Sequence, residues 1–232
     1  MQNLRFDRLA NLDHLVLDRP NRRGAVVLLH GYGADFTDLS GLATVADPAQ
    51  DWDWYFPNGP LEVPYAGRAW FPIDAGALEA SIRSGNPRPF ATYEPKGMAA
   101  ASETVQELVA TLAQRYESVC LGGFSQGAMV TCDAALCGKQ KPAALLQLSG
   151  TFAAEQRWTA AIEREQVNFP VLQSHGRHDP LLPFSAAEEL QRFWQKHQVP
   201  HRFLPFQGGH EIPYDVLQAL RLFLKELIPR GS

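Results

Sequence analysis

Short apolar runs recur along this chain, separated by longer segments in which polar and apolar positions are mixed. Residues 25–29, 119–121 and 143–148 are largely apolar. Such runs are typical of parallel strands that are covered on both faces. The predicted strands are residues 12–17, 25–29, 52–56, 119–121, 143–148, 171–174 and 201–206. The first of them is predicted at an edge of the sheet.

Between the strands, apolar positions follow the period of a helix. Val105, Leu108, Val109, Leu112 and Tyr116 form one apolar stripe, as expected of an amphipathic helix. The other predicted helices are residues 36–45, residues 126–137, a helix that starts at a capping box in residues 185–188, and a final helix after Pro213.

Strands that alternate with helices predict an α/β protein with a mostly parallel sheet and helices on both faces. We expect a single domain over residues 1–228. Residues 229–232 resemble the remnant of a protease tag and are expected to form a flexible tail. Residues 61–95 follow no clear period, and a connection of this length in a compact domain is usually functional. Gly138 is predicted to end a helix in the left-handed conformation.

Composition and charge exclude several classes of partner. The chain has 232 residues, 45% of them apolar and 20% charged, and a net charge of −4. This charge gives no footprint for nucleic acid or for an anionic membrane. No apolar run approaches the length of a membrane span, so stable membrane insertion is not expected. The three cysteines lack metal-site spacing and predict free thiols in a reducing compartment, hence a cytoplasmic location. Oligomeric state stays open.

The candidate chemistry centres on a Gly-x-Ser-x-Gly pattern formed by Gly123, Ser125 and Gly127. It lies where a predicted strand ends and a helix begins, so Ser125 is expected on a sharp turn that exposes its hydroxyl above the sheet. The glycines are expected because a Cβ at either position would collide with the neighbouring strand and helix. The pattern therefore predicts a nucleophilic serine.

A serine hydroxyl needs a base to take its proton, and a third group must hold that base in one tautomer. Asp179 and His210 each follow a predicted strand, and the chain order Ser125, Asp179, His210 is the one this architecture uses. All three lie at carboxyl ends of strands, where open α/β sheets place their sites. We predict Asp179 as the orienting carboxylate and His210 as the base.

Backbone N–H groups of Gln126 and Tyr32 are the predicted oxyanion hole. Gln126 follows the nucleophile, and Tyr32 lies in the glycine-rich loop after the strand at residues 25–29. His30 is expected to brace that loop. His178 is a competitor for the base, but its adjacency to Asp179 favours a loop histidine. Although His175 and His178 have ligand-like spacing, no metal or other cofactor is expected.

Six blocks of sequence resemble the carboxylesterase and acyl-protein thioesterase family of α/β hydrolases over nearly the whole chain. The blocks are residues 29–35, 56–60, 68–71, 123–127, 175–179 and 208–210. The resemblance implies an α/β-hydrolase fold and the same three roles for Ser125, Asp179 and His210. Two departures from the family pattern concern the substrate. Relatives usually carry Leu where this chain has Tyr32. They also usually carry an aspartate soon after the aromatic pair at residues 70–71, whereas here Pro72 and Ile73 come before Asp74.

Trp70, Phe71 and Leu182 are the expected substrate-binding residues, with core packing an equal alternative for Trp70 and Phe71. The predicted function is a serine carboxylesterase that hydrolyses small acyl esters of short to medium chain length through an acyl-enzyme on Ser125. Its alternatives are an acyl-protein thioesterase or lysophospholipase with the same residues, and a non-catalytic hydrolase-fold binding protein.

Overall fold

The computed structural model describes residues 3–20, 22–64, 67–73, 76 and 94–228. Their main feature is an eight-stranded sheet with the order β1-β2-β4-β3-β7-β8-β9-β10. The strands are β1 (Asn3–Leu9), β2 (Leu12–Asp18), β3 (Gly24–Leu29), β4 (Trp52–Pro57), β7 (Val119–Phe124), β8 (Ala144–Leu148), β9 (Val171–Gly176) and β10 (His201–Phe206). All neighbours from β4 to β10 are parallel. The predicted fold class is confirmed.

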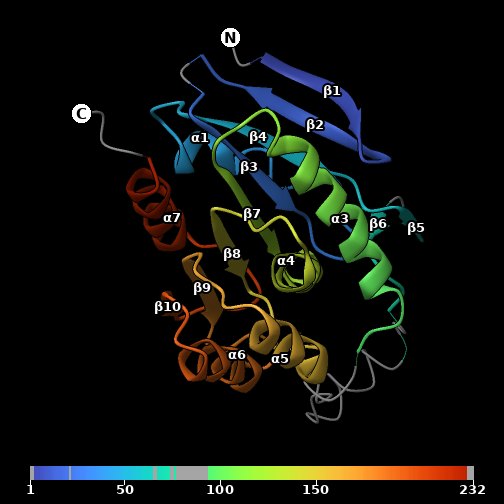
Figure 1. Cartoon of the computed structure of the whole chain (residues 1–232), viewed down its shortest axis with the longest axis vertical. Coiled ribbons are helices and arrows are strands. Elements are labelled where there is room, and N and C mark those ends of the chain that lie inside the picture. Colours follow the sequence, from blue (N-terminus) through green and yellow to red (C-terminus); the bar gives the residue numbers. More distant parts are fainter. Residues whose placement is uncertain (1–2, 21, 65–66, 74–75, 77–93, 229–232) are drawn as a thin grey trace.

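Helices cover both faces of this sheet (Figure 1). They are α1 (Leu42–Ala46), α3 (Met98–Leu112), α4 (Gln126–Cys137), α5 (Glu155–Arg164), α6 (Phe184–Lys196) and α7 (Tyr214–Glu226). Apolar residues of α3 to α6 share one core, and those of α1 and α7 share the other. Within the described residues, no helix is long and apolar enough to cross a membrane.

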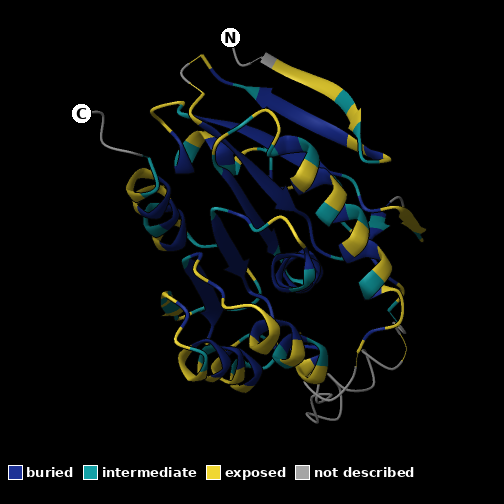
Figure 2. Ribbon diagram, viewed as in Figure 1, coloured by how far each residue is buried: buried dark blue, intermediate teal, exposed yellow. Residues whose placement is uncertain are grey.

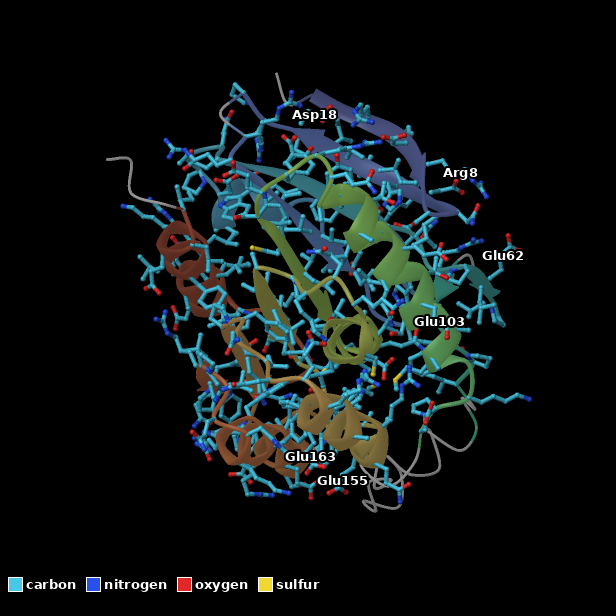
Figure 3. All side chains as sticks on the ribbon, viewed as in Figure 1. Arg8, Asp18, Glu62, Glu103, Glu155 and Glu163 are labelled. Carbon is cyan, nitrogen blue, oxygen red and sulfur yellow. The ribbon has the colours of Figure 1, made fainter. Side chains whose placement is uncertain are left out.

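The central strands and α4 are the most deeply buried elements (Figure 2). Every residue of β3, β4, β8 and β9 is buried, which explains the near-continuous apolar sequences of β3 and β8. By contrast, α3 and α5 turn charged side chains outward, among them Glu103, Glu155 and Glu163 (Figure 3). The free thiols Cys120 and Cys132 are buried in the core, and burial raises the pKa of both.

The sheet edge differs from the prediction. Residues 12–17 were expected at the edge, but β2 is flanked by β4 and by β1, an exposed strand that sequence reasoning missed. A two-residue turn joins β1 to β2, with Ala10 at φ 48° and Asn11 at φ 60°. This left-handed pair matches the twist of a hairpin, but alanine is a weak signal for it.

Three helix predictions are corrected. Of the helix expected at residues 36–45, only α1 forms. The residues before it make successive turns, each closed by a backbone hydrogen bond between residues three apart. Gly138 has φ −70° and ψ 148°, an extended conformation. Glycine is needed there for space, since a Cβ would lie 2.6 Å from the Ala134 carbonyl oxygen. The capping box is also wrong: α6 begins at Phe184, and its N-cap is Pro183 without a side-chain cap.

Part of the irregular segment at residues 61–95 has regular structure. Residues Leu61–Val63 (β5) and Gly67–Ala69 (β6) pair as an antiparallel ribbon. A Cβ on Gly67 would strike the Gly33 carbonyl, so the ribbon packs directly on the loop after β3. Residues 65–66, 74–75 and 77–93 of this segment, and the predicted tail at 229–232, lie outside the described residues.

Acid should destabilise the fold through its buried histidines. Burial lowers the pKa of His14, His30 and His175, and it lowers that of His201 to about 4. Because the unfolded chain binds protons at about pH 6.5 and the native chain does not, the free energy of unfolding should fall from pH 6.5 to 4. Urea unfolding at pH 7.5, 6 and 5 measures this fall.

The control is His201→Gln, which keeps a neutral partner for the Gln173 amide oxygen, 3.1 Å from His201 Nε2. This variant should lose less stability on acidification than the parent. Equal losses in the two proteins would contradict a contribution from His201.

Candidate active site

Ser125 lies between β7 and α4 in a strained backbone conformation, with φ 55° and ψ −117°. Non-glycine residues rarely adopt such angles, and where they persist the surroundings enforce them. Here the Ser125 N–H donates to the Leu148 carbonyl oxygen at 3.0 Å, and the Ser125 carbonyl accepts from Ala128 at 3.0 Å. Both hydrogen bonds fix the turn in place.

The glycines around Ser125 are required for the reason the sequence predicted. A Cβ on Gly127 would lie 2.5 Å from the carbonyl oxygen of Leu29 at the end of β3. A Cβ on Gly123 would strike the backbone of Gly127. Strand and helix therefore meet without intervening side chains, and the Ser125 hydroxyl can face outward from the sheet edge.

Asp179 and His210 come from two loops that are tied together. The Arg177 N–H donates to the Phe206 carbonyl oxygen at 2.9 Å, and the His178 N–H donates to that of Gly208 at 3.0 Å. A Cβ on Gly176 would strike the Gly209 carbonyl, so the loops touch at their backbones. This contact brings residues that are far apart in sequence within hydrogen-bond distance.

His210 Nδ1 lies 2.6 Å from Asp179 Oδ2, and the Asp179 side chain is fully buried. The other oxygen, Oδ1, accepts the N–H groups of Leu181 at 2.8 Å and Leu182 at 2.9 Å. Burial raises the pKa of Asp179, but the hydrogen bonds from His210 and Leu182 outweigh it and hold the pKa below its ordinary value. The carboxylate is therefore ionised at neutral pH.

An ionised carboxylate can only accept a hydrogen bond, so Nδ1 of His210 carries the ring proton. Its Nε2 is then a free base on the opposite side of the ring. The ring of Phe124, the residue before Ser125, packs on the His210 ring with 4.7 Å between centroids. The imidazole is thus held beside the serine turn.

Ser125 and His210 face one cavity of about 230 Å³. Its walls are mainly apolar. Besides these two residues, the lining consists of Gly31, Tyr32, Ala34, Asp38, Phe71, Pro72, Ile73, Pro95, Phe124, Gln126, Met129, Leu181 and Leu182. The sequence-predicted residues Tyr32, Gln126, Phe71 and Leu182 therefore meet the candidate nucleophile and base in a single space.

The loop after β3 is braced as expected of His30. Its Nδ1 lies 2.7 Å from the Gly31 carbonyl oxygen, and its Nε2 accepts the Gly59 N–H at 2.9 Å. Burial lowers the pKa of His30, which favours the neutral ring that this pair of bonds requires. The ribbon adds two bonds, from the Gly33 N–H to the Arg68 carbonyl at 2.9 Å and from the Arg68 N–H to that of Ala34 at 2.8 Å.

Tyr32 and Gln126, the residues predicted to supply the oxyanion hole, both line the cavity. Gln126 is the first residue of α4, where an N–H has no acceptor within the helix. Tyr32 lies between Gly31 and Gly33, and its own N–H has no acceptor within the described part of the chain. Both groups are free to donate to an oxyanion that forms beside Ser125.

For Trp70 and Phe71 the alternatives were core packing and a place in the substrate wall, and the two residues differ in which one their positions support. Trp70 lies behind the cavity: its indole N–H donates to the His30 carbonyl at 2.9 Å, so it braces the loop. Phe71 belongs to the lining. The Gln126 side chain holds the backbone of both residues, because its Oε1 accepts the Trp70 backbone N–H at 2.9 Å and its Nε2 donates to the Phe71 carbonyl at 2.8 Å.

Sequence reasoning used only the backbone of Gln126 and missed this clamp. It also missed the contact between Phe124 and His210. Gln126 and Phe124 lie within the Gly-x-Ser-x-Gly pattern, so their position in the motif was the available signal. His178, the competitor for the base, is exposed, whereas His175 is buried; the pair does not share one site.

The eight-stranded sheet, the strained serine turn and the histidine-carboxylate pair define an α/β hydrolase. The sequence profile of the phospholipase/carboxylesterase family matches residues 15–228. The chain belongs to this family, whose members include esterases and acyl-protein thioesterases.

Individual relatives agree with that assignment. Acyl-protein thioesterase 1 of Eremothecium gossypii is 26% identical over 214 residues, which is 87% of this chain and 86% of the relative. The crystal structure of esterase PE8 is 28% identical, with a TM-score of 0.77 over 93% of this chain and 99% of the other. A carboxylesterase from Mesorhizobium loti, 18% identical, has the same fold, with a TM-score of 0.75 over 97% of this chain and 99% of the other.

Proposed function

We propose that this protein is a serine carboxylesterase for small acyl esters of short to medium chain length. The observation that carries the proposal is the strained turn at Ser125, which faces the same cavity as an imidazole bonded to a buried carboxylate. Backbone conformations that cost about 1 to 3 kcal/mol persist only where the surroundings enforce them, and they cluster at active sites.

In the proposed reaction, Ser125 Oγ attacks the ester carbonyl carbon while His210 Nε2 takes the hydroxyl proton. The oxyanion that forms accepts hydrogen bonds from the N–H groups of Tyr32 and Gln126. The tetrahedral intermediate collapses, and His210 returns the proton to the departing alcohol. Water then attacks the acyl-enzyme with His210 as base, the bond to Ser125 Oγ breaks to release the acid, and His210 returns the proton to Ser125. Asp179 holds the imidazole throughout.

The cavity favours small acyl groups. Its volume of about 230 Å³ is below the roughly 300 to 1,000 Å³ typical of sites for larger ligands. Tyr32 adds a bulky ring at the border of the cavity, where members of the family usually carry Leu. No described segment at the cavity is an amphipathic lid helix of the kind that interfacial lipases use.

A thioesterase acting on acylated proteins is the second candidate. The relative from Eremothecium gossypii carries the name acyl-protein thioesterase 1, and thioester hydrolysis needs the same nucleophile, base and oxyanion hole. The two candidates differ in the acyl group and the leaving group that the cavity accepts.

A series of p-nitrophenyl esters from acetate to palmitate tests the proposal. Each methylene that contacts the apolar wall should raise kcat/KM by at most about fourfold, equivalent to about 0.8 kcal/mol, until the cavity is filled. We expect a maximum at short to medium length. A maximum at palmitate, or faster turnover of palmitoyl thioesters than of butyrate esters, would put the thioesterase first.

A matched pair of variants shows whether the cavity sets the optimum. Leu182→Phe fills space at the wall and should move the maximum to a shorter acyl chain. Leu222→Phe makes the same change on α7, where the side chain is 58% exposed, and should leave the profile as in the parent. Identical profiles for both variants would place the acyl group elsewhere.

A further inference from the structure

His175 is a buried imidazole beside the candidate site, and the proposed reaction does not use it. It is the penultimate residue of β9, the strand that leads into the Asp179 loop, and it is 0% exposed. Its Nε2 lies 3.3 Å from Asp179 Oδ2, the same oxygen that contacts His210. The same Nε2 lies 2.9 Å from the Leu182 carbonyl oxygen.

The hydrogen on His175 can be assigned from these two neighbours. A carbonyl oxygen and an ionised carboxylate are both acceptors, so Nε2 carries the hydrogen. It donates this hydrogen to the Leu182 carbonyl, with Asp179 Oδ2 at 3.3 Å as a longer electrostatic contact. Burial lowers the pKa of His175, although the Leu182 carbonyl and Asp179 oppose this shift. The ring is therefore a neutral donor near pH 7.

Besides Leu182, the Gly150 backbone lies close enough to His175 to raise its pKa. His210 and Asp179 face it from the loops after β10 and β9. The Phe184 ring packs edge-on against it from α6, with 6.2 Å between centroids, and the Arg177 guanidinium lies 4.8 Å from the centroid of that same ring. Packing on Phe184 restricts the rotation of the imidazole, so its N–H has a fixed direction.

Asp179 and Leu182 are already joined on their other side, because the Leu182 N–H donates to Asp179 Oδ1. The His175 N–H closes the ring of contacts, because it is bonded to the Leu182 carbonyl and lies 3.3 Å from Oδ2. Both carboxylate oxygens are thereby fixed. Since the Leu182 side chain lines the cavity, one imidazole links the wall of the cavity to the carboxylate behind the base.

We propose that His175 is a positioning residue for ester hydrolysis: its Nε2–H orients the Asp179 carboxylate toward His210 and anchors the Leu182 wall. This inference rests on the proposed function, because it assigns His175 a task in the same reaction. His175 touches neither the substrate nor the serine, and it acts only through Asp179 and Leu182.

The test compares two side chains of similar length. Glutamine at position 175 can place an amide N–H near the position of Nε2, whereas methionine fills the space without a donor. His175→Met should lower kcat by about tenfold to a hundredfold, the size typical of removing an outer hydrogen-bond partner of a functional imidazole in metal sites. His175→Gln should retain about a third of kcat or more.

The pH profile separates positioning from packing. Without the donor, the negative charge on Asp179 is less well satisfied and stabilises the imidazolium of His210 more strongly. The acid limb of the kcat/KM profile should therefore move up by about half a pH unit in His175→Met. A residue with only a packing role would lower thermal stability equally in both variants and leave this limb unmoved.

Three outcomes would overturn the inference: parental kcat in His175→Met, equal losses in the Gln and Met variants, or an unmoved acid limb. Should His175→Met fail to fold, His175→Asn replaces it, since its amide is one methylene too short to reach Asp179. Labelling of the parent by a fluorophosphonate separates the two proposals. A parent that neither reacts nor hydrolyses esters refutes the esterase, whereas a reactive parent with unaffected variants refutes only the task of His175.

Discussion

Ser125→Ala should lower kcat for ester hydrolysis by about 10⁴-fold or more while the fold remains intact. The substitution removes one hydroxyl from a turn whose hydrogen bonds are all made by the backbone. His210→Ala should cause a loss of similar size, and the double variant should lose little more, because the two groups act as a unit. Initial rates with a short-chain p-nitrophenyl ester measure all three.

Intact mass after treatment with a fluorophosphonate identifies the nucleophile directly. The parent should gain one adduct and Ser125→Ala none. Ser174→Ala is the matched control, because Ser174 is a buried serine on β9 whose hydroxyl has no hydrogen-bond partner in the described structure. It should keep both the adduct and the activity. An adduct on Ser125→Ala would move the nucleophile to another residue, and an unlabelled parent would favour the non-catalytic binding protein.

The central part of the fold could be predicted because its sequence signals are local and strong. The runs that became β3 and β8 are apolar throughout or nearly so, as a strand covered on both faces requires. Gly123 and Gly127 indicate a turn where strand and helix touch, and a Cβ at either position would indeed clash with backbone atoms. The chain order of Ser125, Asp179 and His210 follows from the topology of such sheets.

The periphery could not be predicted in the same way. Strand β1 is exposed and mixes charged and apolar residues, so its sequence resembles a loop, and only pairing with β2 makes it a strand. Gly138 was expected in a left-handed cap, but a close approach to Ala134 requires glycine there instead. Sequence alone does not separate these two uses of glycine.

Within the candidate site, the missing information concerned tertiary contacts. The Gln126 amide joins α4 to the Trp70 and Phe71 backbone, across 56 and 55 positions of sequence. His175 lies four residues before Asp179, and its spacing to His178 suggested metal ligands. Only the structure shows that one of these histidines points into the core and the other lies on the surface. Motifs identified the candidate reacting groups, whereas the groups that hold them are set by contacts between distant parts of the chain.

Asp179→Asn should lower kcat by about 10³- to 10⁴-fold with little effect on the fold. In the parent, the N–H groups of Leu181 and Leu182 donate to Asp179 Oδ1. The amide oxygen of the variant can still accept both. The introduced NH₂ group then faces His210 Nδ1, where a donor meets a donor. His210 relieves this conflict by moving its ring proton to Nε2, and the lone pair that should take the Ser125 proton is lost.

Asp133→Asn is the matched control for this substitution, because Asp133 is also a fully buried carboxylate, located on α4 and paired with Arg157 at 2.8 Å. Weakening that pair should lower the free energy of unfolding by about 1 to 3 kcal/mol without a comparable loss of kcat. Asp179→Asn should show the reverse, a large loss of kcat with a small change in urea midpoint. Near-parental turnover in Asp179→Asn would remove Asp179 from the reaction. A loss of kcat that merely follows a loss of stability in both variants would assign Asp179 to the fold alone.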